Sequence, residues 1–165
     1  MSGTLPTRQD AVKAAQRTPA GTEMTNVLVE VIRLAEHFTR TGEELARSEG
    51  QTLARWLVLE TLEGGPRPVA EVARRLRLAR QSVQRVADLL ERDRLVAYET
   101  NPRHRRAKLA RLTPAGRRAL SRIQRAQREW ADRHGAEVGL GDLERAVELL
   151  RRMRAILTGP TDDHL

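Results

Sequence analysis

The sequence predicts a mainly α-helical protein with one small β-hairpin directly behind a helix-turn-helix. Apolar residues recur at helical spacing over most of the chain, which favours amphipathic helices. Two short segments of this kind, 68–76 and 80–92, are separated by only three residues, as in a helix-turn-helix. Two strand-like segments, 95–100 and 108–112, then flank a polar turn that contains proline, which is typical of a hairpin.

The composition also favours helices over a thick β-sandwich. The chain has 165 residues, enough for one domain to bury a core without disulfides or metals. Its hydrophobic share is 39% and its aromatic share only 2%, so the core must consist of Leu, Val and Ala. Helices that share long seams bury such side chains well, and Leu and Ala are strong helix formers.

The sequence of the N-terminal region predicts a flexible tail followed by a long helix. We interpret the polar residues 1–21 as the tail and residues 22–165 as a single domain. Thr22 is a suitable N-cap for a helix that ends near Arg47. The apolar residues of this helix cover a broad arc, so we expect it to bury one face in its own domain and another against a partner subunit. They are Val27, Val31, Leu34 and Phe38, widened by Leu28, Ile32 and Ala35.

The next helix is predicted over residues 51–63, and the sequence Gly64-Gly65-Pro66 ends it. Its inward-facing residues are expected to be Leu53, Trp56, Leu57 and Leu62.

The second helix of the helix-turn-helix, residues 80–92, carries the candidate DNA-reading side chains. Such a helix lies in the major groove, where Arg commonly pairs with guanine and Gln with adenine. The alternative is a surface helix that is polar for solubility. The preceding Arg74, Arg75 and Arg77 would contact phosphates or nothing. The candidate base-reading residues are Arg80, Gln81, Ser82, Gln84 and Arg85.

The turn of the hairpin is cationic, with Arg103, Arg105 and Arg106 in a stretch of six polar residues. A narrow minor groove has a strong negative potential, which favours arginine at a hairpin tip that enters it. The alternative is ordinary solvation of a charged turn. We therefore predict that these three arginines contact DNA.

The C-terminal part predicts two further helices. Thr113 and Pro114 form a favourable cap and first position for a helix that extends to about His134. A loop is expected over residues 135–141, followed by a last helix with near-heptad apolar residues. That seam is too apolar to remain in water. It comprises Leu143, Ala146, Val147, Leu150, Met153 and Leu157.

The positive charge is concentrated in the helix-turn-helix and the hairpin. Residues 67–118 contain 15 Lys and Arg against 5 Asp and Glu, a balance of +10, whereas the whole chain carries +8. The remaining residues therefore sum to −2. Clustered charge of this kind indicates a nucleic-acid surface, while a generally arginine-rich protein would spread the excess along its length.

Several classes of function find no support in the sequence. There is no cysteine, which excludes disulfides and thiolate metal sites. The four histidines, His37, His104, His134 and His164, are dispersed without a ligand pattern. No nucleophile with its base, phosphate loop or apolar run that could span a membrane is present. We therefore expect no enzyme activity, cofactor, metal or membrane contact, and a cytoplasmic location.

Three segments of the chain are similar in order and spacing to those of a known family. They are Leu-Leu-Glu-Arg-Asp-Arg-Leu-Val at 89–96, Asn-Pro-x-x-x-Arg at 101–106 and Leu-Thr-Pro-Ala-Gly at 112–116. With these segments the sequence resembles the multiple-antibiotic-resistance-regulator (MarR) family over about residues 53–157. The resemblance implies a winged helix-turn-helix fold, with a DNA-binding region at about 51–112 and dimerisation helices at about 22–47 and 113–158.

The resemblance implies a homodimer that binds palindromic double-stranded DNA, usually as a repressor and often released by a small ligand. Arg106 aligns with the family's wing arginine. An aromatic or phenolic effector would lodge between the dimer helices and the DNA-binding region, where His37, Phe38 and Trp56 are the candidates. The alternative is that Phe38 and Trp56 only supply bulk to an aromatic-poor core.

Two departures from the family pattern carry consequences. His104 replaces the acidic residue that usually helps to brace the wing arginine, so the wing is expected to be looser or to be held in a different way. Arg94 replaces a glycine after the recognition helix, where a left-handed conformation costs a non-glycine residue about 1 kcal/mol. We therefore expect this helix to end by another route. We therefore keep two hypotheses. One is a sequence-specific regulator, and the alternative is an architectural protein that binds DNA with low specificity.

Overall fold

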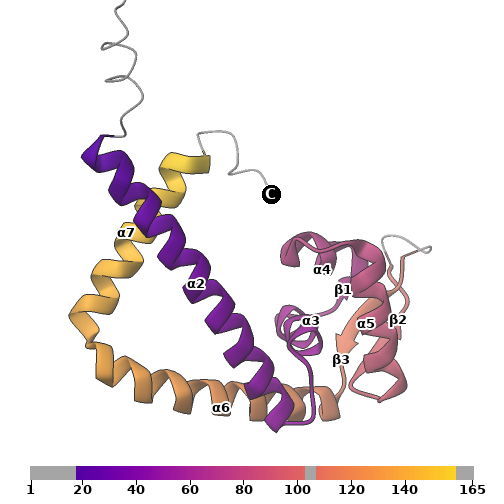
Figure 1. Cartoon of the computed structure of the whole chain (residues 1–165). Helices are drawn as coiled ribbons and strands as arrows, with labels where there is room; N and C mark the ends of the chain where they lie inside the picture. The colour runs from indigo at the N-terminus through magenta and orange to yellow at the C-terminus, as the bar shows by residue number, and fades with distance from the viewer. Residues whose placement is uncertain (1–17, 103–106, 159–165) are drawn as a thin grey trace, which may run out of the picture. The chain divides into compact units, whose positions relative to one another are not determined.

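The computed structural model describes residues 18–102 and 107–158, and over these residues it confirms the predicted fold class (Figure 1). Contacts divide the chain into two compact units, Met1–Glu44 and Leu45–Leu165. The helices are α2 (Pro19–Ser48), α3 (Leu53–Glu63), α4 (Val69–Leu76), α5 (Arg80–Arg92), α6 (Pro114–Val138) and α7 (Leu140–Thr158). The strands are β1 (Arg67–Pro68), β2 (Val96–Glu99) and β3 (Leu109–Leu112).

Helix α2 begins earlier than predicted, and Thr22 is not its N-cap. Thr18 is the capping residue, because its Oγ1 accepts a hydrogen bond from the backbone N–H of Gly21 at 3.0 Å. Pro19 follows at the first helical position, where its fixed φ is favourable. The same Thr-Pro pairing begins α6 at Thr113.

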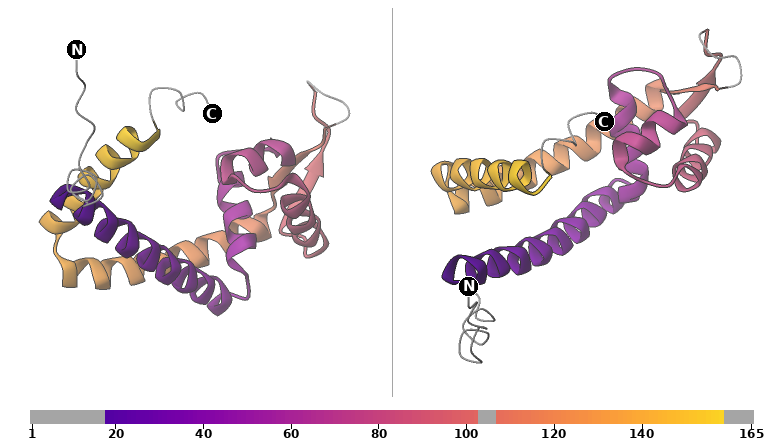
Figure 2. Two further views of the ribbon diagram at one scale, coloured as in Figure 1. Left: turned by 45° about the horizontal axis from the view of Figure 1, so that its top comes forward. Right: turned by 90° about the horizontal axis from the view of Figure 1, so that it is seen from above.

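Helices α3, α4 and α5 pack together with the small sheet to form a winged-helix lobe, which we define as residues 53–112. The predicted hairpin is present: β2 pairs antiparallel with β3, with Val96 opposite Leu112 and Glu99 opposite Leu109. This hairpin extends beyond the three helices of the lobe (Figure 2). The lobe therefore holds the second helix of the helix-turn-helix and the hairpin on one framework.

A third strand, β1, was not predicted. Arg67 lies opposite Ala110 and Pro68 opposite Leu109, so β3 is the central strand of a three-stranded sheet. Strand β1 leads into α4 without an intervening loop. The sheet is thereby joined directly to the first helix of the helix-turn-helix.

The core of the lobe is built from aliphatic side chains. Leu59 on α3 and Leu90 on α5 are each 0% exposed. Helix α6, which follows the lobe, adds Ile123 to the same core, also at 0%. Trp56 is also buried, as predicted, but the prediction that Leu57 faces inward was wrong, since it is exposed. The buried residues of α3 include Val58 and Leu59, so the adjacent Leu57 falls on the outward side of the helix.

The predicted loop over residues 135–141 is wrong. Helix α6 continues through Gly135 to Val138, and only Gly139, with φ of 91°, separates it from α7. Gly135 accepts a helical hydrogen bond from the N–H of Gly139 at 2.9 Å. A glycine inside a helix weakens it by only about 1 kcal/mol, which neighbouring residues outweigh.

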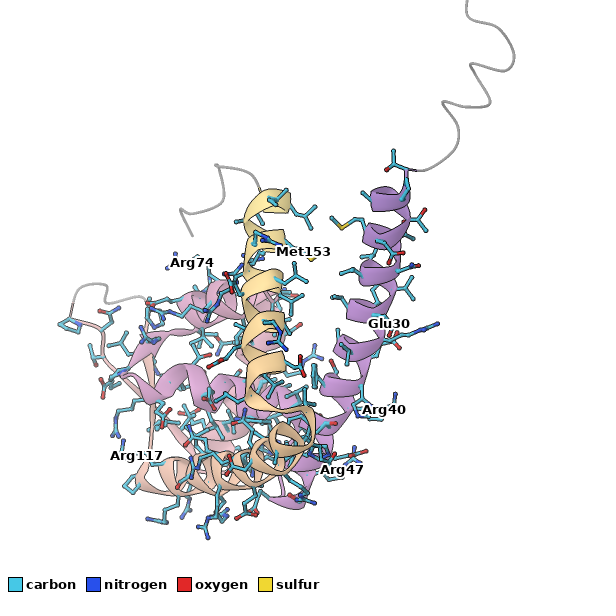
Figure 3. The ribbon with its side chains drawn as sticks, turned by 90° about the vertical axis from the view of Figure 1, so that its left-hand side faces the viewer. Glu30, Arg40, Arg47, Arg74, Arg117 and Met153 are labelled. Atoms are coloured by element: carbon cyan, nitrogen blue, oxygen red, sulfur yellow. The ribbon has the colours of Figure 1, made fainter. Side chains whose placement is uncertain are left out.

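Helix α7 has no buried residue over its 19 positions. Met153, labelled in Figure 3, is half-buried, and every other residue of the helix is exposed. Leu150 is 47% exposed and Leu157 is 70% exposed. The predicted apolar seam therefore exists, but it is not covered within the unit to which α7 belongs.

Candidate nucleic-acid interface

Helix α5 presents a polar face on the side opposite its buried residues. Val83, Ala87 and Leu90 are buried in the lobe. The helical period places Gln81 and Arg85 roughly half a turn away from that stripe. Both residues are exposed. Their side chains thus point away from the lobe, as the major-groove prediction requires.

Four of the five predicted base-reading side chains are available for contact. Arg80, Gln81, Ser82 and Arg85 are exposed. No hydrogen bond or ion pair joins these four side chains to another residue that the structure describes. Their guanidinium, amide and hydroxyl groups can therefore bind an external partner without breaking an internal contact.

The fifth predicted residue, Gln84, is half-buried, and its side chain is held by two neighbours. Its Nε2 donates to Asp88 Oδ1 at 2.8 Å and to the hydroxyl oxygen of Tyr98 at 2.9 Å. The Tyr98 hydroxyl in turn donates to Asp88 Oδ1 at 3.0 Å. Tyr98 lies on β2, so this triad joins the β2–β3 hairpin to α5. In the fold that the resemblance implies, this hairpin is the wing and α5 is the recognition helix.

The Tyr98 hydroxyl remains protonated over the range in which proteins bind DNA. Burial, and then the hydrogen bond and charge of Asp88, raise the pKa of Tyr98 to about 12. Its O–H therefore stays a donor to the carboxylate. Neither Tyr98 nor Asp88 was identified from the sequence, although the four-residue spacing of Gln84 and Asp88 on a helix was a visible signal for that pair.

The end of α5 adopts the left-handed cap that the family pattern requires, despite the missing glycine. Arg94 has φ of 59°. Its N–H donates to the carbonyl of Glu91 at 2.8 Å, and the N–H of Leu95 donates to the carbonyl of Leu90 at 2.9 Å. These two bonds form a Schellman motif. Helix α5 thus ends in the common Schellman motif, although the left-handed position is occupied by an arginine instead of a glycine.

Helix α4 ends in the same way at Arg77, whose φ is 53°. The N–H of Leu78 donates to the carbonyl of Ala73 at 3.0 Å. The tight turn between α4 and α5 therefore contains a second arginine in a left-handed conformation. By contrast, α2 is followed by Gly50 with φ of 70°, where no such strain arises.

The start of α6 packs against the exit of the recognition helix. Thr113 Oγ1 accepts from the N–H of Gly116 at 3.0 Å and donates to the carbonyl of Arg94 at 2.7 Å. A Cβ atom on Gly116 would lie 2.0 Å from the carbonyl oxygen of Leu95. The segments 89–96 and 112–116, which carry the family resemblance, are therefore in direct contact.

A second element braces the exit of the recognition helix. Arg55 on α3 donates to Asp93, the last residue before Arg94. The side chain of Arg55 is mostly buried. This ion pair therefore links α3 to the end of α5, and neither residue was identified from the sequence.

The arginines at the end of α4 line a hollow of about 740 Å³. Glu71 binds Arg67 at 3.0 Å and Arg75 at 2.9 Å. Burial alone would raise the pKa of Glu71, but the hydrogen bonds and charges of Arg75 and Arg67 outweigh it and lower this pKa below its ordinary value. Arg74 and Arg77 are exposed. The region keeps a positive surplus next to the recognition helix.

The remaining predicted site residues lie outside α5. Arg103, Arg105 and Arg106, together with His104, lie outside the described residues. His37 and Phe38 are exposed on α2. Trp56 is 8% exposed in the core, and its indole N–H donates to Glu60 Oε2 at 2.8 Å. Trp56 is therefore packed in the core of the lobe, whereas Phe38 is not buried.

The described residues were also compared with the requirements of a metal site and of a membrane-spanning helix. Among residues 18–102 and 107–158, no group of three or more His, Asp or Glu is placed to hold a metal ion. Over the same described ranges, no helix is both long and apolar enough to cross a membrane.

Comparison with known sequences identifies relatives of the chain. A sequence model of the MarR family matches residues 49–107. The uncharacterised protein Rv2011c of Mycobacterium tuberculosis is 37% identical over 131 residues, which are 79% of this chain and 92% of that protein. The uncharacterised protein Mb2034c of Mycobacterium bovis matches with the same identity and coverage.

Comparison with solved structures identifies the same fold. Sco5413, a MarR family transcriptional regulator from Streptomyces coelicolor, has a TM-score of 0.70 at 23% identity, covering 87% of this chain and 100% of that chain. A MarR protein of Staphylococcus aureus, solved in complex with salicylate and kanamycin, has a TM-score of 0.74 at 14% identity, covering 83% and 93%. Together with the sequence matches and the winged-helix lobe, these findings show that the chain belongs to the MarR family of DNA-binding transcription regulators.

Proposed function

We propose that this chain is a sequence-specific repressor that binds a palindromic operator as a homodimer. The observation that carries the proposal is the outward face of α5. There Gln81 and Arg85 are exposed opposite a buried apolar stripe. The surplus of positive charge over residues 67–118 adds the sequence-independent part of the affinity for DNA. The role is that of a regulator rather than an enzyme.

The homodimer is supported by apolar side chains that the single chain leaves exposed. On α2, Leu28 is 56% exposed and Ile32 is 51% exposed. On α7, Val147 and Leu150 are also exposed. Monomeric proteins rarely expose apolar stripes of this kind, which mark interaction surfaces. A two-fold symmetric pair would present two recognition helices to successive major grooves, ~34 Å apart, and hence to an inverted repeat.

Selection of bound fragments from random double-stranded DNA tests this proposal. We expect an inverted repeat to be enriched, with a specific affinity at least ~10³-fold above the non-specific affinity at the same salt concentration. A protein that coats DNA would enrich no motif. That outcome would replace the regulator with the architectural alternative.

Two single substitutions separate the roles of helix and wing. Arg85→Ala is expected to relax the preference at one position of the selected motif, since a good base contact contributes about 1–3 kcal/mol of discrimination. Arg106→Ala is expected to weaken binding to all sequences and to reduce the salt slope by about 1. If Arg85→Ala leaves the motif unchanged, the assignment of α5 as the reading helix is wrong.

We also propose that a small aromatic or phenolic effector releases the DNA. His37 and Phe38 are adjacent exposed ring side chains on α2, and the Staphylococcus aureus relative was solved with salicylate. An effector that binds the DNA-free state more tightly would lower operator affinity by linkage, typically 5–150-fold. The test is operator affinity in the presence of a panel of phenolic acids, with Phe38→Ala as the control variant. Affinity that no compound changes would contradict this part of the proposal.

A further inference from the structure

The triad of Gln84, Asp88 and Tyr98 commits all of its hydrogen-bond donors. The Asp88 carboxylate can only accept, so the amide atom 2.8 Å away from it must be the NH₂ group of Gln84. The same nitrogen donates its other hydrogen to the Tyr98 hydroxyl at 2.9 Å. The single hydroxyl proton of Tyr98 then goes to Asp88 at 3.0 Å. The carbonyl oxygen Oε1 of Gln84 is not used in the triad, so its lone pairs can still accept a hydrogen bond.

This arrangement changes what Gln84 can read. A glutamine that binds adenine in the usual bidentate way needs one N–H donor and one oxygen acceptor at the same time. Gln84 has no spare donor while the triad is intact. Its oxygen can still accept a hydrogen bond, and in the major groove only cytosine N4 and adenine N6 offer one.

The triad also lies where nucleic acid can reach it. A hollow of about 400 Å³ beside it is lined by Gln84 and Tyr98. Its charged lining residues are the cations Arg80 and Lys108 and the acidic Glu91. Gln84 follows Gln81 by one helical turn on α5, so the two amides lie along the same flank of the helix. The N-terminal residues of a recognition helix are those that usually contact base edges.

We propose that Tyr98, a residue of the wing strand, is a specificity-determining residue that acts through Gln84. By holding the amide as an acceptor only, Tyr98 makes Gln84 select cytosine or adenine and reject guanine and thymine at one operator position. This inference rests on the proposed function as a sequence-specific DNA-binding protein. Tyr98 is a positioning residue in this scheme, because it acts on the base through another side chain.

The test is Tyr98→Phe, which removes the hydroxyl and keeps the ring. Fragments are selected from random DNA with the wild type, Tyr98→Phe, Asp88→Ala and Gln84→Ala, after unfolding curves show that each variant is folded. Gln84→Ala identifies the operator position, because its preference should disappear there. Tyr98→Phe and Asp88→Ala each free one N–H of Gln84. Both should shift that position towards adenine alone, with the ratio of adenine to cytosine rising about fivefold or more.

The outcomes separate a failure of the proposed function from a failure of the role assigned to Tyr98. If the wild type enriches no motif, the proposed function fails, and the inference fails with it. If the wild type enriches a motif but Tyr98→Phe only weakens binding to every sequence equally, Tyr98 has a purely structural role and the inference alone is overturned. Arg92→Ala is the matched control, because Arg92 is exposed on the same helix and is not one of the predicted base-reading residues. It should leave the position assigned to Gln84 unchanged.

Discussion

Helices α5 and α7 are both amphipathic, but the apolar side chains of α5 are buried and those of α7 are exposed. The apolar stripe of α5 is closed within the lobe, where Val83 is 1% exposed and Leu90 is 0% exposed. The stripe of α7 remains open, with Leu150 at 47% exposure. The difference shows that the apolar side of α5 is already covered by its neighbours in the core, so this helix can present polar groups outward. The terminal helix, in contrast, needs another surface before its apolar residues leave water.

The largest expected effect comes from disrupting the open stripe. Val147→Glu combined with Leu150→Glu places two charges on it, and burying a charge without a partner is strongly unfavourable. We expect the mass in sedimentation to fall from two chains to one. Operator affinity should then fall at least ~100-fold, since linked binding of two half-sites is lost. Arg152→Glu, on the opposite side of α7, should preserve the dimer. A double mutant that still sediments as two chains would contradict the role of α7.

The next largest effect concerns the closed region. Gly116→Ala would push a methyl group into the backbone of Leu95, at 2.0 Å from its carbonyl oxygen. Overpacking of this kind typically lowers the free energy of unfolding by about 1–3 kcal/mol or more. The matched control is Gly135→Ala in the same helix, where the nearest atom would be 3.7 Å away. That substitution should stabilise the protein by up to about 1 kcal/mol. Equal effects in urea unfolding would show that the two ends of α6 are packed alike.

A smaller effect is expected at the end of α5. Arg94→Gly relieves a left-handed conformation and should raise the free energy of unfolding by about 1 kcal/mol. Arg92→Gly, two residues earlier and still helical, should lower it by about 0.5–1 kcal/mol. Denaturant unfolding of both variants measures the contrast. A loss of stability in Arg94→Gly would mean that the arginine side chain contributes more than its backbone strain costs.

The smallest effect concerns the ion pairs of Glu71. Its pKa in the folded protein lies below the ordinary value of 4.5, so the unfolded chain takes up a proton first as the pH falls. The stabilisation is therefore fully present above that value and is lost as the pH falls through the lowered pKa. Glu71→Gln should be less stable than the wild type at pH 7, and the difference should disappear in acid. A difference that is independent of pH would exclude the charge as its cause.

Much of the lobe could be predicted because its residues follow local rules. The bounds of α5 were predicted correctly from its alternation of apolar and polar faces, and the pairing of Thr113 with Pro114 identified the start of α6. The two-residue strand β1 could not be predicted, because it contains a proline and is defined only by pairing with β3. Gly135 misled the prediction, since a favourable helix on both sides outweighs one weak residue.

The site residues could be predicted only where the position of a side chain does not depend on a partner from another part of the chain. Gln81 and Arg85 follow from helical periodicity. The state of Gln84 does not, because its partner Tyr98 lies 14 residues away on the wing strand, and their contact depends on how the hairpin packs against α5. Arg94 shows a similar limit. Its residue type argues against a left-handed cap, but the bonds of the Schellman motif hold it there.

The short strand β1 has a consequence for anyone who wishes to transplant this wing into another scaffold. Arg67 and Pro68 pair with Ala110 and Leu109, although more than forty positions separate them along the chain. A cassette cut only around the hairpin would leave β3 with a bare edge, and an unpaired edge invites aggregation. The smallest transferable module therefore includes Arg67, Pro68 and the two helices that follow. The hairpin and the helix-turn-helix must be transferred together.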